Sequence, residues 1–290
     1  MVATPLGNLE DLTLRALRVL KEVDLIAAED TRHSRALLAH YGISTPLTSY
    51  YDQVERRKAP QLVAELQRGR RVALICDAGT PGIADPGYHL VRAAVDAGVR
   101  VEPIPGPSAV IAALSVGGLP TDRFVFEGFV PAKPGARRAF FAALAQEART
   151  TVVYEAARRL QACLRDLCDT LGNRPLVIAR ELTKRFEEIR RGPARQLAEQ
   201  LREGDAARAL QGEVTLLIAG AAAPRAADLD LAGAIRRLRA AGMGLKEIAR
   251  TIAGAHGIPQ RLVYRAGLEL HGEAEVPPRL PRRDKHLQDT

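Results

Sequence analysis

The chain of 290 residues is long enough for two domains of ordinary size, and its 47% hydrophobic content supports buried cores. It has no run of membrane-spanning length and no basic-then-apolar amino-terminal signal, so we expect a cytoplasmic protein without a membrane partner. The net charge of +8 and the pI of about 9.7 suit a polyanionic partner, and no cluster of His, Cys and carboxylate residues predicts a metal.

The first part of the chain alternates predicted strands and helices. Apolar strands are expected at 23–27, 71–76 and 99–102, with helices between them. This alternation predicts a mostly parallel sheet with helices on both faces, forming an amino-terminal α/β domain over residues 1–118.

Three turns rich in Gly and Pro follow predicted strands. They cover residues 2–8, 77–87 and 103–108, and the last ends in Ser108, which can cap the next helix. A purely structural turn with an Asp cap is the alternative for the long loop, but capping needs only one such residue. Parallel neighbouring strands would set the loops side by side, so together they predict one ligand cleft.

A second α/β domain is expected over residues 119–222. Strands are predicted at 123–127, 150–154, 175–179 and 214–219, with a long helix after the second of them. The cleft between the two domains is the expected cofactor site.

Beyond a linker-like stretch at 221–227, three short helical patterns form a predicted appendage over residues 229–272. The spacing of the last two resembles a helix-turn-helix, which favours nucleic-acid contact. The alternative is a helical element that packs on itself or on a dimer mate. Residues 273–290 are polar and rich in Pro and Arg, and we expect a disordered tail there.

Six segments along the chain carry a recognisable pattern: Thr4–Leu9, Ala28–Arg32, Asp77–Gly87, Pro105–Ser108, Gly128–Lys133 and Ala179–Lys184. In this order they resemble the ribosomal RNA small subunit methyltransferase I family, which has the tetrapyrrole-methylase fold of class III S-adenosylmethionine-dependent methyltransferases. The chain resembles this family over nearly its whole length. The resemblance implies S-adenosylmethionine-dependent 2′-O-methylation of a cytidine in the decoding region of 16S rRNA, within the small ribosomal subunit, by a homodimer.

The chain departs from the family in three places. Few residues precede the Thr4-Pro5 turn, His and Asn are scarce around residues 50–55, and Ala156 and Arg158 stand where the family often has Ser and His. These departures concern catalytic side chains and leave the cofactor loops unchanged.

The candidate site residues fall into three groups. Loop residues expected to bind the cofactor are Asp77, Gly79, Thr80, Ser108 and Ala109, and analogy with the fold adds Tyr154 and Val214. Residues expected to serve catalysis and RNA positioning are Glu29, Asp30, Arg32, Glu181 and Lys184. A basic loop supplies the expected RNA contacts Lys133, Arg137 and Arg138.

The roles follow from side-chain chemistry. Arg32 and Lys184 can bind phosphate or lower the pKa of a hydroxyl, and Asp30 or Glu181 could accept a proton. Salt bridges between the domains are the alternative for 29–32 and 180–184, and a solvated surface loop is the alternative for the basic residues.

Two other functions compete with RNA methylation. A methyltransferase of the same fold acting on a tetrapyrrole would need neither a basic surface nor a helical appendage. A non-enzymatic nucleic-acid-binding protein would leave the three Gly/Pro loops without a purpose.

Overall fold

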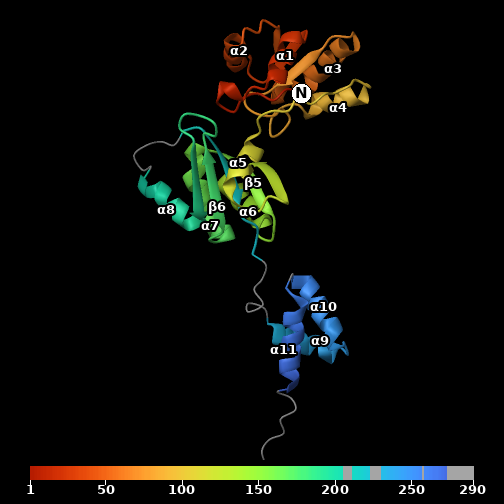
Figure 1. Cartoon of the computed structure of the whole chain (residues 1–290), viewed down its shortest axis with the longest axis vertical. Coiled ribbons are helices and arrows are strands. Elements are labelled where there is room, and N and C mark those ends of the chain that lie inside the picture. Colours follow the sequence, from red (N-terminus) through yellow and green to blue (C-terminus); the bar gives the residue numbers. More distant parts are fainter. Residues whose placement is uncertain (205–210, 223–229, 257, 273–290) are drawn as a thin grey trace, which may run out of the picture. The chain divides into compact units, whose positions relative to one another are not determined.

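The computed structural model describes residues 1–204, 211–222, 230–256 and 258–272. The chain divides into two compact units, residues 1–221 and 222–290 (Figure 1). By packing, we distinguish a first lobe, residues 1–108, and a second lobe, residues 109–221, within the first unit. Most of the expected linker and the whole expected tail, 273–290, lie outside the described residues.

The first lobe contains a three-stranded parallel sheet in the order β2-β1-β3. Its elements are a 3₁₀ helix (Leu9–Asp11), α1 (Leu14–Glu22), β1 (Leu25–Ala28), α2 (Thr31–His40), β2 (Leu47–Ser49), α3 (Asp52–Gln67), β3 (Val72–Ile75) and α4 (Tyr88–Asp96). Helices α1 and α2 cover one face of this sheet, and α3 and α4 cover the other (Figure 1). Ile26 and Ala28 belong to the core on the first face, and Ala27 belongs to the core on the second. The predicted parallel sheet with helices on both faces is confirmed.

The strand predicted at 99–102 does not form. Ile104 instead makes one isolated parallel bridge with Val2, and the Met1 ammonium donates a hydrogen bond to the Glu102 carbonyl at 3.0 Å. The expected neighbouring strand is therefore absent from the sheet. Residues 1–4 lie in this region and make isolated bridges, but they form no regular strand. A cavity of about 460 Å³ lies here, beside the start of β3 and not at its loop end.

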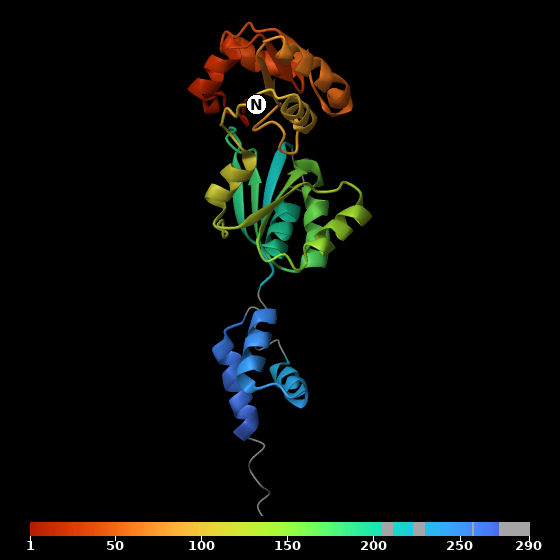
Figure 2. The same cartoon turned by 90° about the vertical axis from the view of Figure 1, so that its right-hand side faces the viewer.

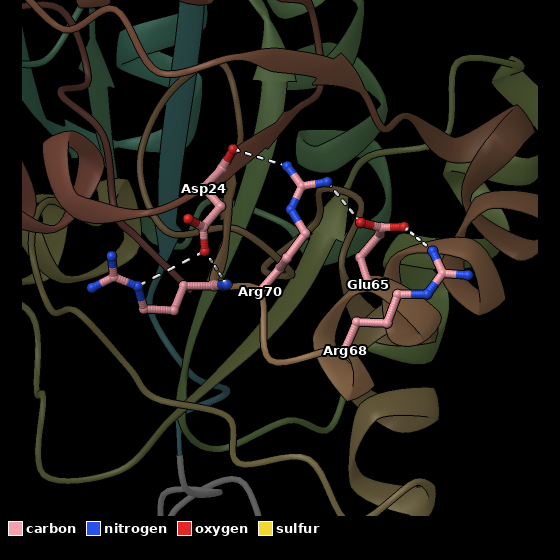
Figure 3. A network of polar contacts seen from close by, with 5 residues as sticks. Asp24, Glu65, Arg68 and Arg70 are labelled. Atoms are coloured by element: carbon pink, nitrogen blue, oxygen red, sulfur yellow. Dashed lines mark hydrogen bonds and ion pairs between the residues drawn. The ribbon is translucent and has the colours of Figure 1, made fainter.

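A polar network joins the end of α3 to the starts of β1 and β3 (Figure 3). Glu65 accepts from both Arg68 and Arg70 at 2.7 Å, and Arg70 also donates to the backbone carbonyl of Asp24. The Asp24 carboxylate in turn accepts from the backbone N–H of Arg71 at 2.7 Å. These ion pairs lie at the surface, where solvent screens them, so they contribute little to the stability of the fold.

The second lobe contains a five-stranded sheet in the order β4-β5-β8-β6-β7. Its elements are α5 (Ala109–Gly117), β4 (Phe124–Phe129), α6 (Pro134–Ala143), β5 (Thr150–Ala156), a 3₁₀ helix (Ala157–Arg159), α7 (Leu160–Leu171), β6 (Pro175–Arg180), β7 (Glu188–Pro193), α8 (Ala194–Gly204) and β8 (Glu213–Ile218). Only β4 and β5 pair in parallel. Helix α5 covers one face, and α6, α7 and α8 cover the other (Figure 2).

The helical unit consists of α9 (Leu231–Ala240), α10 (Leu245–His256) and α11 (Gln260–Gly272), close to the three predicted helices. Asp230 caps α9 by accepting from the Gly233 N–H at 2.8 Å. The unit has its own core, formed mainly by Ile235, Ile248, Ile252, Ile258 and Val263. In the described part of the chain, no helix is long and apolar enough to cross a membrane.

One predicted RNA contact lies in the interior of the second lobe. The Arg137 guanidinium donates to Asp166 at 2.6 and 2.7 Å, and the side chains of both residues are at most 6% exposed. Lys133 and Arg138 are the exposed residues of the predicted basic loop. We therefore leave Arg137 out of the proposed RNA contacts.

Replacing Arg137 with Ala should lower the free energy of unfolding by about 3–5 kcal/mol, because Asp166 would remain as a buried, uncompensated charge. Urea denaturation measures this difference. Arg138→Ala is the matched control: its side chain is 56% exposed and lies 3.7 Å from the same carboxylate, so its cost should stay within about 0.5 kcal/mol. An equal loss in the free energy of unfolding for the two variants would contradict a buried ion pair between Arg137 and Asp166.

Candidate functional site

The three Gly/Pro-rich turns meet at the carboxyl ends of the strands in the first lobe. Thr4 and Gly79 exchange two backbone hydrogen bonds of 2.8 and 3.0 Å. The Thr80 hydroxyl donates to the carbonyl of Pro107 at 3.0 Å, which joins the long loop to the loop before α5. The predicted side-by-side placement of these turns is confirmed.

Asp77 ties the end of β3 to the end of β1 by a reciprocal pair of hydrogen bonds. Its backbone N–H donates to the Glu29 carboxylate at 3.2 Å, and its own carboxylate accepts from the Asp30 N–H at 3.1 Å. Three predicted site residues thus lie together although 48 positions separate Glu29 from Asp77.

Asp30 and Arg32 form a pair within the first turn of α2. Asp30 caps the helix by accepting from the Arg32 N–H at 2.8 Å, and its carboxylate also binds the Arg32 guanidinium at 2.7 Å. These hydrogen bonds hold the pKa of Asp30 well below its usual range. Asp30 is therefore a weak proton acceptor, whereas Arg32 remains 86% exposed.

Two carboxyl groups at the strand-end loops hold their protons unusually strongly. Burial, aided by the charges of Asp85 and Asp77, raises the pKa of Glu29 to about 7. Burial also raises the pKa of Asp85 to about 6, with Glu213 and Asp77 adding repulsion. The sequence indicates that Asp85, like Asp77, can accept a hydrogen bond from a ligand, but Asp85 is not among the selected cofactor residues. Its partial burial, which raises the pKa, depends on the folded loop and leaves no signal in the sequence.

Two other loop residues lie at the start of α5. Ser108 occupies the cap position, but its hydroxyl makes no capping hydrogen bond. Ala109 follows as the first helical residue and packs partly buried against the second sheet.

The second lobe contributes Tyr154, which hydrogen-bonds to the backbone of Val110. Burial, aided by the Asp85 charge, raises the pKa of Tyr154 to about 12, so the tyrosine acts as a neutral group. The rings of Phe126 and Phe129 lie edge-on to it, with centroids 4.9 and 5.3 Å away. The Val214 side chain, by contrast, belongs to the core on the opposite face of the sheet, so only its backbone remains available to a ligand.

Glu181 and Lys184 bind each other within the loop between β6 and β7. The Lys184 ammonium lies 3.0 Å from the Glu181 carboxylate, which also accepts from the Glu213 N–H at 3.1 Å. The Lys184 side chain lies so close to Gly7 that a Cβ there would overlap it. This loop therefore packs on the first turn of the first lobe.

The alternative of salt bridges between the domains is not observed at these residues. In the described ranges, the pairs Asp30–Arg32 and Glu181–Lys184 each stay within one segment. Nor does any group of three or more His, Cys, Asp and Glu side chains in those ranges have the geometry to hold a metal ion.

The raised pKa of Glu29 predicts a pH-dependent stability. The folded protein holds this proton more strongly than the unfolded chain, whose Glu pKa is 4.5. The associated stability is fully present below about pH 4.5 and is lost as the pH rises through about 7. Glu29→Gln has no such loss, so its stability relative to wild type should increase by about 1–2 kcal/mol from pH 5 to pH 8, after allowance for solvent screening. Urea denaturation at several pH values measures this; a difference independent of pH would contradict it.

Comparison with known proteins agrees with this geometry. A sequence model of the Tetrapyrrole (Corrin/Porphyrin) Methylases matches residues 1–198. Proteins named ribosomal RNA small subunit methyltransferase I from Pseudomonas aeruginosa and Synechocystis are 47% and 46% identical, each covering 94% of this chain and 98% of the relative.

Solved structures show the same fold at low identity. A uroporphyrin-III-C-methyltransferase from Thermus thermophilus has a TM-score of 0.52 and 23% identity, covering 75% of this chain and 92% of its own. A diphthine synthase has a TM-score of 0.53 and 14% identity, covering 75% and 88%. These structures show the fold, and the 47% identity over nearly the whole length shows that the chain belongs to the ribosomal RNA small subunit methyltransferase I family.

Proposed function

We propose that this protein transfers a methyl group from S-adenosylmethionine to the ribose 2′-hydroxyl of a cytidine in the decoding region of 16S rRNA. The main observation that supports this proposal is that the Gly/Pro loops meet, joined by the hydrogen bond from Thr80 to Pro107. This junction belongs to the same group of strand-end loops as the contact between Glu29 and Asp77. The names of the relatives support a small-subunit RNA substrate. The cytidine and the 2′-oxygen rest on the family resemblance, as does a homodimer.

The charges at the strand-end loops fit the proposed cofactor. S-adenosylmethionine carries a sulfonium and an ammonium, and these loops bring together the carboxyl groups of Glu29, Asp77 and Asp85 in a protein of net charge +8. When bound, the cofactor supplies an electrophilic methyl group. The residues that would hold it are Asp77, Gly79, Thr80, Ser108 and Ala109, with Tyr154 and the backbone of Val214.

Glu29 is the best-suited proton acceptor among the candidates. A ribose hydroxyl is poorly acidic, and a general base is most effective when its pKa lies near the working pH. Glu29 meets this condition with a pKa of about 7, whereas Asp30 is bound by Arg32 and Glu181 by Lys184. We therefore assign the base to Glu29, in place of Asp30 or Glu181.

Exposed basic groups provide the proposed phosphate contacts. Lys133 and Arg138 lie at the start of α6, next to the end of β4. The helical unit adds exposed cations, namely Arg236, Arg237, Lys246, Arg250, Arg261 and Arg265. Such residues attract RNA through charge and counterion release, so the affinity for the subunit should fall as salt rises.

A methylation assay on small ribosomal subunits tests the function and the base together. Wild type should methylate a cytidine 2′-oxygen, at a rate that rises with pH through about 7 because Glu29 must be deprotonated. Glu29→Gln should lower kcat by about 10²–10⁴-fold and remove this pH dependence. The exposed Glu10→Gln is the control and should match wild type.

Two results would contradict the proposal. Methylation of a porphyrin precursor, with no modification of small subunits, would favour a tetrapyrrole substrate. A methyl group found on a base instead of the ribose would exclude the 2′-hydroxyl.

Substitution of Gly79 tests the cofactor loop. Gly79 has a φ of +86° and packs so closely that a Cβ would lie 3.2 Å from Leu6, so Gly79→Val should weaken S-adenosylmethionine binding at least tenfold. Gly98→Val is matched for backbone strain, since Gly98 has a φ of +70° with open space around it. Calorimetry should show unchanged affinity for that control, and equal affinities in both folded variants would remove the loop from the site.

A further inference from the structure

We propose that Phe186, together with Arg185, forms a stacking platform for an unpaired RNA base next to the methylated nucleotide. The inference rests on the proposed function, because it requires an RNA substrate. It adds a substrate-positioning element to the loop between β6 and β7, which also holds the predicted site residues Glu181 and Lys184.

Phe186 is unusual for its exposure. Its side chain is 70% exposed in a chain whose aromatic content is only 4% and which has no Trp. The Arg185 guanidinium carbon lies 5.6 Å from the centre of the ring. An aromatic face with an adjacent guanidinium is the combination on which unpaired bases stack, because every base offers a π-face and Arg adds a cation–π contact.

The loop holds this pair in a fixed geometry. Glu181 and Thr183 have positive φ values of 52° and 66°, which cost non-glycine residues energy and need support from their surroundings. That support is present: Leu182 is buried against α5 and the sheet, and the Glu187 carboxylate accepts from the Thr183 N–H at 2.6 Å. The exposed ring therefore belongs to an anchored loop, which reduces the entropy lost when a base stacks on it.

The platform lies at the site edge of the second sheet. Cross-strand pairing aligns Ala179 with Thr215, and Thr215 with Tyr154, so β6 ends on the same edge as the tyrosine. Lys184, two residues before Phe186, packs on Gly7 of the first lobe. A base on the platform would accordingly neighbour the cleft in which the ribose must be held.

Local charges favour RNA over a protein partner. The nearby carboxylates are already engaged: Glu181 binds Lys184, Glu187 binds the Thr183 N–H, and Glu188 binds Arg180. Within the described residues, Arg185 has no carboxylate partner and keeps its charge for a phosphate or a base. Phe186 stands between exposed Arg185 and Glu187, whereas an apolar protein interface needs a contiguous apolar patch.

Because the chain lacks Trp, Phe186→Trp places a single fluorescent reporter on the platform. Adding small ribosomal subunits should quench its emission in a saturable way, since a stacked base quenches the indole. The control is Val95→Trp, at a 58% exposed position near the end of α4 and therefore away from the strand-end loops, which should not respond.

Kinetics provide the second measurement. Phe186→Ala should raise the KM for small subunits by about 5- to 150-fold, the range expected for one stacked base, while S-adenosylmethionine affinity stays unchanged. Phe186→Tyr should retain most of the wild-type KM because it keeps the aromatic face. Val95→Ala should behave as wild type.

Each contrary outcome has a separate meaning. If wild type methylates small subunits but the Phe186→Trp signal does not respond and Phe186→Ala keeps its KM, the platform is wrong and the proposed function stands. A signal that changes with protein concentration and not with subunits would assign the ring to contact with a second copy. If wild type leaves small subunits unmodified, the proposed function fails, and the platform fails with it.

Discussion

The contact between Asp77 and the end of β1 is the constraint on which the site depends. A parallel sheet brings the carboxyl ends of its strands to one edge, and the reciprocal hydrogen bonds with Glu29 and Asp30 fix two of those ends together. The same contact holds Glu29 where it is partly desolvated and close to other carboxylates. Burial, together with the charges of Asp85 and Asp77, raises the pKa of Glu29 there, against the hydrogen bond from the Asp77 N–H, which lowers it.

The carboxyl groups gathered at the loops and the net positive charge of the chain suit ligands of opposite charge. Under the proposed function, the carboxyl groups would stabilise a positively charged cofactor, while the net charge of +8 would attract a phosphate backbone. The carboxyl groups at the loops and the net positive charge of the chain serve different ligands. Composition reveals the second property directly, but the first emerges only when Glu29, Asp77 and Asp85 are brought together by folding.

Sequence reasoning succeeded where local chemistry decides the structure. Gly, Pro and Asp at strand ends predict turns, and the predicted contact between the loops forms between Thr80 and Pro107, although only the isolated Val2–Ile104 bridge stands in place of the strand expected before Pro107. It failed where long-range packing decides. Strand β7 is not predicted, because the charged residues Glu188 and Arg190 make its sequence look like a solvated loop. In the structure, this segment pairs with β6, and the two charged side chains form an ion pair with each other. In the sequence Arg137 looks like a surface cation. Its buried ion-pair partner, Asp166, lies on another helix and is not apparent before the chain folds.

The contact between Lys184 and Gly7 explains why segments 177 positions apart must act together. Only glycine fits at position 7, because any side chain would displace Lys184 from its place beside Glu181. Lys184 in turn depends on a loop with two strained residues, which persists because Leu182 is anchored in the second lobe. The first turn of the first lobe and the β6–β7 loop of the second lobe therefore pack directly against each other. Under the proposed function, a nucleotide held on that loop would be positioned by the same contacts that join the loop to the first turn.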